Sequence, residues 1–93
     1  MTDDLEYFDG LEEVTLTIGA NAHVIEALRR PMSARVEEGM PIVRAAWHVR
    51  VAELDGDVPA NGDVLEAGTE QWSVVQVERV SFGVRFRLVC ERV

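Results

Sequence analysis

The sequence contains no lysine, because all nine of its basic residues are arginines. This absence excludes enzymes that form a Schiff base on a lysine and nucleotide-binding proteins that use the P-loop lysine. Cys90 is the single cysteine, so an internal disulfide is impossible and a thiolate metal site would need unusual partners. There is no apolar run long enough to span a membrane, and the acidic start lacks the features of a signal peptide. We therefore expect a soluble chain in the cytoplasm, with no membrane partner.

Recognisable catalytic motifs are also missing. The chain has no G-x-S-x-G, H-E-x-x-H or C-x-x-C sequence, and its glycines match no phosphate-binding loop. His48 would lie on the polar face of a strand beside Arg44 and Arg50, which is typical of a surface histidine. Cys90 falls on the apolar face of the last strand and is expected to be a small core residue. The sequence predicts that the protein is not an enzyme and has no cofactor or metal.

Charge is unevenly distributed along the chain. Residues 1–13 contain six acidic residues and no basic one, whereas the remaining residues contain eleven acids and nine arginines. We expect residues 1–13 to be a flexible acidic leader and residues 14–93 to form one domain. The acidity of the leader disfavours general affinity for nucleic acid, since phosphate binding depends on clustered cations.

Alternation of apolar and polar residues with a period of two predicts most of the secondary structure. Strands are expected at 14–18, 43–52, 63–66, 72–80 and 84–93, with Trp47 and Phe86 on the apolar side. The segment HVIEALRR, residues 23–30, is compatible with a returning strand or a short helix, and Pro31 favours the strand because it limits a helix to about eight residues. Residues 31–41 are bracketed by prolines and show no clean period, so a long loop is expected there.

No window of the chain has a convincing helical period. The fold class is therefore predicted to be all-β, a small barrel or sandwich of five to six strands. Closure into a barrel is favoured because it leaves no long strand edge exposed.

The acidic stretch from Asp55 to Glu66 partly matches an EF-hand calcium loop. Pro59 and Ala60 occupy positions where that loop needs an oxygen ligand and a glycine, and strands rather than helices flank it. The EF-hand is therefore excluded, while a looser calcium site remains an alternative to a plain connection between strands.

The second half of the chain resembles the small head-tail connector proteins of tailed phages and prophages, the head-completion, joining or stopper group. The resemblance lies in a strand with a tryptophan, AAWHVRVAEL, followed by a P-x-x-G-D step made of Pro59, Gly62 and Asp63. A hairpin follows whose second strand begins at Trp72 and continues with alternating valines, and VRFRLVCERV closes the chain. The opening DLEYFDGLEEVTLTI and the segment ALRRPMS are also similar to members of this group.

This resemblance implies a structural protein of the virion neck, present in the host cytoplasm before assembly. It would assemble as a ring of copies between a portal or adaptor protein and the tail proteins, and would line the channel through which DNA passes without tight binding. Net acidity suits such a wall because phosphates are repelled. The residues expected at subunit or partner contacts are Tyr7, Phe8, Met32, Arg35, Glu37, Glu38 and Met40.

A second hypothesis is a cytosolic small-barrel module that binds single-stranded nucleic acid or a peptide. Oligonucleotide-binding barrels combine a basic groove with stacking aromatic residues. Arg44, Arg50, Arg85 and Arg87 could share one face of the sheet, but acidic residues are interspersed and aromatics are scarce.

Overall fold

The computed structural model describes residues 10–32 and 35–93 and folds them into a closed six-stranded barrel and a separate two-stranded sheet. The barrel strands are β1 (Leu11–Ile18), β2 (Asn21–Pro31), β5 (Arg44–Arg50), β6 (Val64–Ala67), β7 (Glu70–Val80) and β8 (Arg85–Arg92). The smaller sheet consists of β3 (Arg35–Glu37) and β4 (Met40–Ile42). The predicted all-β class and the closure into a barrel are confirmed.

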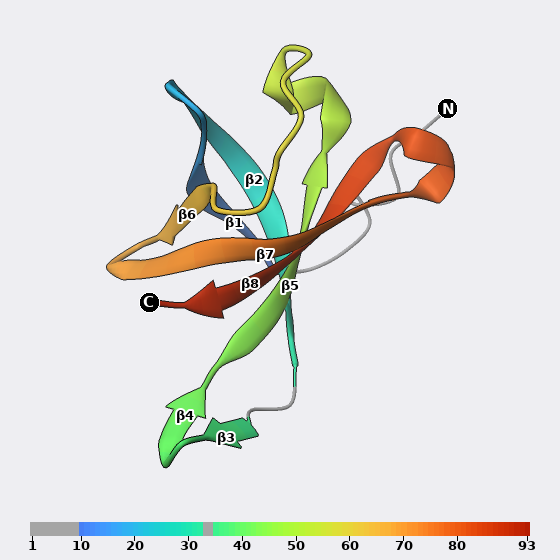
Figure 1. Cartoon of the computed structure of the whole chain (residues 1–93). Helices are drawn as coiled ribbons and strands as arrows, with labels where there is room; N and C mark the ends of the chain where they lie inside the picture. The colour runs from blue at the N-terminus through green and yellow to red at the C-terminus, as the bar shows by residue number, and fades with distance from the viewer. Residues whose placement is uncertain (1–9, 33–34) are drawn as a thin grey trace.

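The strands follow one another around the barrel in the order β1-β2-β5-β8-β7-β6, and β6 returns to β1 (Figure 1). Every neighbouring pair is antiparallel. The closing β1–β6 seam is short, joining only Thr15–Thr17 to Val64–Glu66, whereas β1 and β2 pair over eight residues. Each barrel strand has a partner on both sides, although β2 before Ala27 pairs only with β1 and β7 after Val74 pairs only with β8.

The segment HVIEALRR, residues 23–30, forms a strand, which is the alternative that the position of Pro31 favoured over a short helix. It lies inside β2, which pairs with β1 at one edge and with β5 at the other. The β1–β2 hairpin turns through Gly19 and Ala20, and the positive φ of Gly19 (59°) suits a two-residue hairpin turn. Pro31 is tolerated as the last residue of β2, where the loss of one ladder donor costs little.

Helical structure in the described residues is limited to two 3₁₀ turns, η2 (Val51–Leu54) and η3 (Ser81–Gly83). No helix in residues 10–32 and 35–93 has the length and hydrophobicity that a membrane span requires. The predicted strand 43–52 is too long, because η2 ends it at Arg50. This turn places Leu54 in the core with no exposed surface, a role that strand alternation did not predict.

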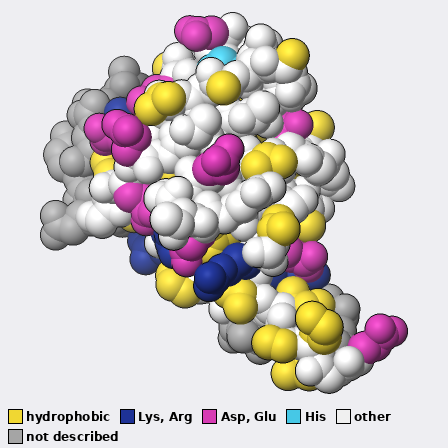
Figure 2. Space-filling model, turned by 90° about the vertical axis from the view of Figure 1, so that its left-hand side faces the viewer, with side chains coloured by type: hydrophobic (Ala, Val, Ile, Leu, Met, Phe, Trp, Pro, Cys, Tyr) yellow, Lys and Arg dark blue, Asp and Glu magenta, His cyan; other side chains and the backbone are white. Residues whose placement is uncertain are grey.

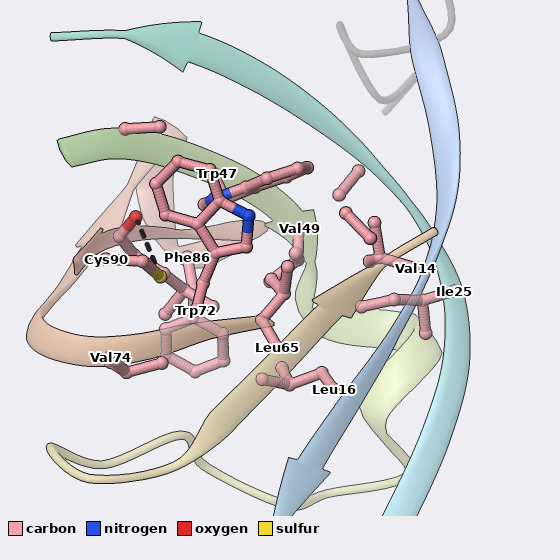
Figure 3. Close-up of a cluster of buried hydrophobic side chains, with 14 of the residues drawn as sticks. Val14, Leu16, Ile25, Trp47, Val49, Leu65, Trp72, Val74, Phe86 and Cys90 are labelled. Atoms are coloured by element: carbon pink, nitrogen blue, oxygen red, sulfur yellow. Dashed lines mark hydrogen bonds between the residues drawn. The ribbon is translucent and has the colours of Figure 1, made fainter. Parts of the chain in front are cut away.

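The barrel interior is filled by one hydrophobic cluster. Figure 3 shows Trp47 from β5 and Trp72 from β7 among the smaller side chains of the other strands. Their rings meet edge to face, with centroids 5.8 Å apart and an interplanar angle of 72°. The buried cluster contains Val14, Leu16, Ile25, Ala27, Ala45, Trp47, Val49, Leu54, Leu65, Ala67, Trp72, Val74, Phe86, Leu88 and Cys90.

The predicted strand faces agree with the structure at Trp47, Phe86 and Cys90 but not at Ala46. Trp47, Phe86 and Cys90 are buried on the apolar side, as predicted. Ala46 was predicted on the polar face and is nevertheless 2% exposed. It pairs with Val89 on β8 and with Arg30 on β2, so the larger neighbours on both sides cover its small side chain.

Arg29 closes one end of this core. Its position opposite Trp47 in the β2–β5 register directs it toward the tryptophans, and its guanidinium carbon lies 4.6 Å from the Trp47 ring centroid and 5.6 Å from that of Trp72. The guanidinium also donates to Glu12 on β1 at 3.0 Å and pairs with Glu70 at the start of β7 at 2.9 Å. A planar cation can stack on rings and bind carboxylates at once, so Arg29 joins three strands at this end.

Cys90 is expected to be unreactive in the folded protein. Its side chain is fully buried, and burial raises the pKa of the thiol to about 12. At about pH 8 almost no thiolate is present, so iodoacetamide should leave Cys90 unmodified. Unfolding in guanidinium chloride should make it react completely, and mass spectrometry distinguishes the two states. Rapid labelling without denaturant would contradict the burial.

Candidate subunit interface

The β3–β4 hairpin projects from the barrel and is called the arm below. Residues 31–41 were predicted as one long loop, and within this segment the chain instead pairs Arg35 with Ile42 and Glu37 with Met40. A two-residue turn at Glu38 and Gly39 closes the arm, and both residues have positive φ angles, 52° and 78°. Such turns match the twist of short hairpins, which explains why this polar Glu-Gly step makes a hairpin rather than an open loop.

The arm has its main contacts within itself, between β3 and β4. Two backbone hydrogen bonds fix its base, one from Met32 N–H to the Arg44 carbonyl (3.2 Å) and one from Arg92 N–H to the Val43 carbonyl (2.9 Å). Figure 1 shows β3 and β4 lying beyond the end of the barrel. The arm is therefore anchored at its base and presents both of its faces outward.

Apolar side chains dominate the exposed surface of the arm. Val36 and Met40 are each 68% exposed, and Val43 and Met32 at the base are 39% and 37% exposed. Figure 2 shows hydrophobic side chains gathered on the projection below the main body. An isolated two-stranded sheet is marginally stable in water, and exposed apolar patches commonly mark interaction sites.

The structure brings part of the predicted interface together. Met40 and Glu38 lie at or beside the turn of the arm, and Met32 lies at its base. Arg35 and Glu37 belong to β3, although only their backbones are described. Tyr7 and Phe8 lie outside the described residues. Sequence reasoning missed Val36, which could have been found as a valine near the methionines in a segment without a core-forming period. Val43 was predicted on the apolar face of the strand 43–52, but it precedes β5 and is 39% exposed.

Pro59, Gly62, Asp63 and Trp72, which carry the family resemblance, have structural roles in the described chain. Trp72 is in the core and Pro59 is buried. Gly62, at a φ of 94°, donates its N–H to the Val74 carbonyl at 2.8 Å. The Asp63 carboxylate accepts the Ala60 N–H at 2.7 Å and that of Gly19 at 3.4 Å. This turn therefore ties β6, β7 and the β1–β2 hairpin together at the end of the barrel opposite the arm.

A second exposed feature is the corner between β7 and β8, which sequence reasoning treated only as a turn. Phe82 is 99% exposed there. Ser81 and Phe82 both have positive φ angles, 53° and 57°, followed by Gly83 at 83°. A fully exposed aromatic in the left-handed region is unusual, because that conformation favours Gly and Asn. The only sequence signal for this exposed side chain is the position of an aromatic residue within a Ser-x-Gly turn.

A shallow hollow of about 450 Å³ lies between the β1–β2 turn and the loop after η2, lined by Ala20, Asn21, Ala22, His23, Asp55 and Asp57. The His23 Nε2 atom lies 2.7 Å from an Asp57 carboxylate oxygen, and the Asn21 amide donates to that oxygen at 3.1 Å. No group of three or more metal-ligating side chains occurs in the part of the chain that the structure describes. The geometry therefore gives no support to the alternative of a calcium site. The contacts of Asp57 with Asn21 and His23 instead join the loop after η2 to the start of β2.

The Asp57 contacts predict a dependence of stability on pH. The hydrogen bond with His23, together with that from Asn21, lowers the pKa of Asp57 below its ordinary value of 3.8. A carboxylate with a depressed pKa stabilises the fold above that ordinary value and loses this contribution as the pH falls through its folded pKa. Asp57→Asn should therefore be less stable than wild type at neutral pH, and the difference should close at acid pH.

Chemical denaturation at a series of pH values measures this difference. Asp55→Asn is the matched control, because Asp55 is exposed and has a φ of 52° that Asn tolerates. A gap between Asp57→Asn and wild type that stays constant below pH 3.8 would show that the ionised carboxylate does not stabilise the loop.

The exposed surface gives little support to a nucleic-acid groove. Arg44 donates to Glu91 at 2.7 Å and Arg87 donates to Glu78 at 3.1 Å, while Arg50 lies 3.8 Å from Glu26. Trp47, Trp72 and Phe86 are buried, so among the described aromatic side chains Phe82 alone is available for stacking. Binding of single strands relies on several stacking residues along a basic groove, whereas the described residues offer one exposed aromatic side chain and several arginines that are paired with carboxylates.

A scan against protein-family models found no match to this chain, and a search of curated proteins found no significant relative.

Proposed function

We propose that this protein is a structural connector of the head-tail junction of tailed phages or prophages, which assembles as a ring and performs no catalysis. The arm is the observation that carries this proposal. It places Val36 and Met40 in solvent, away from the core of the barrel, so these side chains contribute little to the fold of a single copy. Covering them with a neighbouring subunit gives the apolar surface a use.

The closed barrel supports an assembly role for the arm. Every barrel strand has a neighbouring strand on each side, whereas β3 and β4 pair only with each other. A subunit built in this way stays separate from its neighbours along the barrel wall and meets them through a projection. The resemblance of the second half of the chain to phage connectors agrees with this arrangement.

Net charge supports the proposed position around DNA. The chain has a formal charge of −8, and several of its arginines are engaged by carboxylates on adjacent strands. A ring with this charge distribution would repel the phosphate backbone rather than hold it, which suits passage of DNA through a channel.

Mass photometry across a concentration series tests the proposal, with and without a purified phage portal protein. We expect a ring of defined copy number, formed either by the chain alone at high concentration or on the portal. Negative-stain electron microscopy of the same sample should show a central channel. A chain that stays monomeric under both conditions and does not enter particles would overturn the proposal.

A further inference from the structure

The arm and the β7–β8 corner lie at opposite ends of the barrel. β5 runs the length of the barrel between them, because Arg44 at its start follows the arm and Arg50 at its end pairs with Arg85 beside the corner. The six residue-to-residue steps of extended chain from Arg44 to Arg50 span about 20 Å. Figure 1 shows the arm and the turn between β7 and β8 at opposite ends of the barrel. The arm of one copy therefore cannot contact the corner of that copy.

The corner presents Phe82 outward at a cost to the fold. Non-glycine residues in the left-handed region are strained, and two of them are adjacent at Ser81 and Phe82. Because Phe82 is 99% exposed, its ring gains no packing within the barrel that would offset this strain. Val84, next to the corner, is also partly exposed. Strain of this kind at an exposed aromatic is typical of a binding feature.

The two ends are complementary in charge as well as in apolar character. The turn of the arm has the exposed carboxylate of Glu38 between Val36 and Met40. Arg79 is an exposed residue of β7 two positions before the corner, and its guanidinium carbon lies 5.1 Å from the ring centroid of the buried Phe86. An acid flanked by apolar residues at one end thus matches a base that lies three positions before an exposed aromatic at the other.

We propose that the β7–β8 corner of one copy docks on the arm of a neighbouring copy, with Phe82 against Val36 and Met40 and with Arg79 facing Glu38. This inference rests on the proposed ring assembly and names its contact. A flexible methionine thioether adapts well to an aromatic ring, which suits Met40 as the partner of Phe82. The two surfaces differ, so the contact is heterologous and leaves an open chain of copies with one free arm and one free corner until the ring closes.

A mixing experiment tests the contact directly. The arm variant Val36→Thr/Met40→Gln keeps side-chain size while adding polarity. The corner variant Phe82→Asn removes the ring and suits the local backbone, since Asn tolerates the φ of 57° at position 82. Each variant alone should associate at least about tenfold more weakly than wild type. An equimolar mixture should form one-to-one pairs that do not grow, because one intact arm meets one intact corner.

Melting temperature separates this binding role from a structural one. Phe82→Asn relieves strain and should melt at or above the temperature of wild type while it loses association. A structural role for Phe82 would lower the melting temperature instead, and that result would overturn the inference.

Charge exchange provides an independent test. Glu38→Arg and Arg79→Glu should each weaken association about tenfold or more at low salt, and the double variant carrying both changes should recover most of it. A double variant as weak as the worse single variant would contradict the pairing of Glu38 with Arg79.

The outcomes distinguish this contact from the ring proposal. If Phe82→Asn assembles as wild type does, or if the mixed variants remain monomeric, the contact is overturned while the ring can still stand. If wild type stops at two copies and the mixture still forms pairs, the contact holds and the ring is overturned. A wild-type chain that never associates, alone or on the portal, overturns both.

Discussion

Replacing Trp47 with alanine should lower the free energy of unfolding by about 3–5 kcal/mol, because truncation of a buried tryptophan loses apolar contact and leaves a cavity. Trp47 has no exposed surface, meets Trp72 edge to face at 5.8 Å and lies beneath Arg29 at 4.6 Å. Small domains have about 5–15 kcal/mol of stability in total, so this single change removes a large fraction. Urea denaturation followed by circular dichroism measures the loss.

Two companion variants locate the effect. Trp47→Phe keeps an aromatic ring and should cost much less than Trp47→Ala. Phe82→Ala removes a similar ring from a position that is 99% exposed and should change stability by no more than about 0.5 kcal/mol apart from any change in strain. A loss below about 1 kcal/mol for Trp47→Ala would show that the two tryptophans do not form the centre of the core.

The arm variant Val36→Thr/Met40→Gln should abolish ring formation and leave the fold intact. Both side chains are 68% exposed and lie outside the hydrophobic core, so the free energy of unfolding of the monomer should change by about 0.5 kcal/mol or less. Interface residues, in contrast, often cost 1 kcal/mol or more of binding energy when made polar, and a ring repeats that loss at every contact.

Mass photometry and urea denaturation on the same preparation separate the two effects. Val24→Thr is a suitable control, because Val24 is 67% exposed on β2 and belongs to neither the arm nor the corner. Rings formed by the arm variant at wild-type concentrations would show that the arm is not the subunit contact.

Most of the fold was predicted from the alternation of apolar and polar residues along strands. The prediction was wrong where the chain turns out of a strand. Trp47 and Phe86 were assigned to the core because every second residue of a strand faces the same side. The same rule extended the strand past Arg50 and therefore missed Leu54, which a 3₁₀ turn carries into the core. It also could not place Arg29, whose position among the tryptophans depends on the β2–β5 register between distant segments.

The candidate interface was predicted only in part, for a related reason. The length and prolines of residues 31–41 indicated a surface segment, and Met32, Glu38 and Met40 were found within it. The hairpin depends on the positive φ angles of Glu38 and Gly39, and no apolar period marks strands of three residues. Phe82 was missed because sequence alone does not show that a phenylalanine in a turn has no core to enter.

The short β1–β6 seam has a kinetic consequence. It is formed by three residue pairs between segments that are about fifty positions apart in the chain, whereas β1 and β2 are adjacent and pair along eight residues. Joining distant segments costs more chain entropy, so the barrel should close at this seam late in folding and reopen there first. Amide protons of β6 should then exchange with deuterium sooner than those of β5, and each brief opening would expose two strand edges through which chains could swap strands or aggregate.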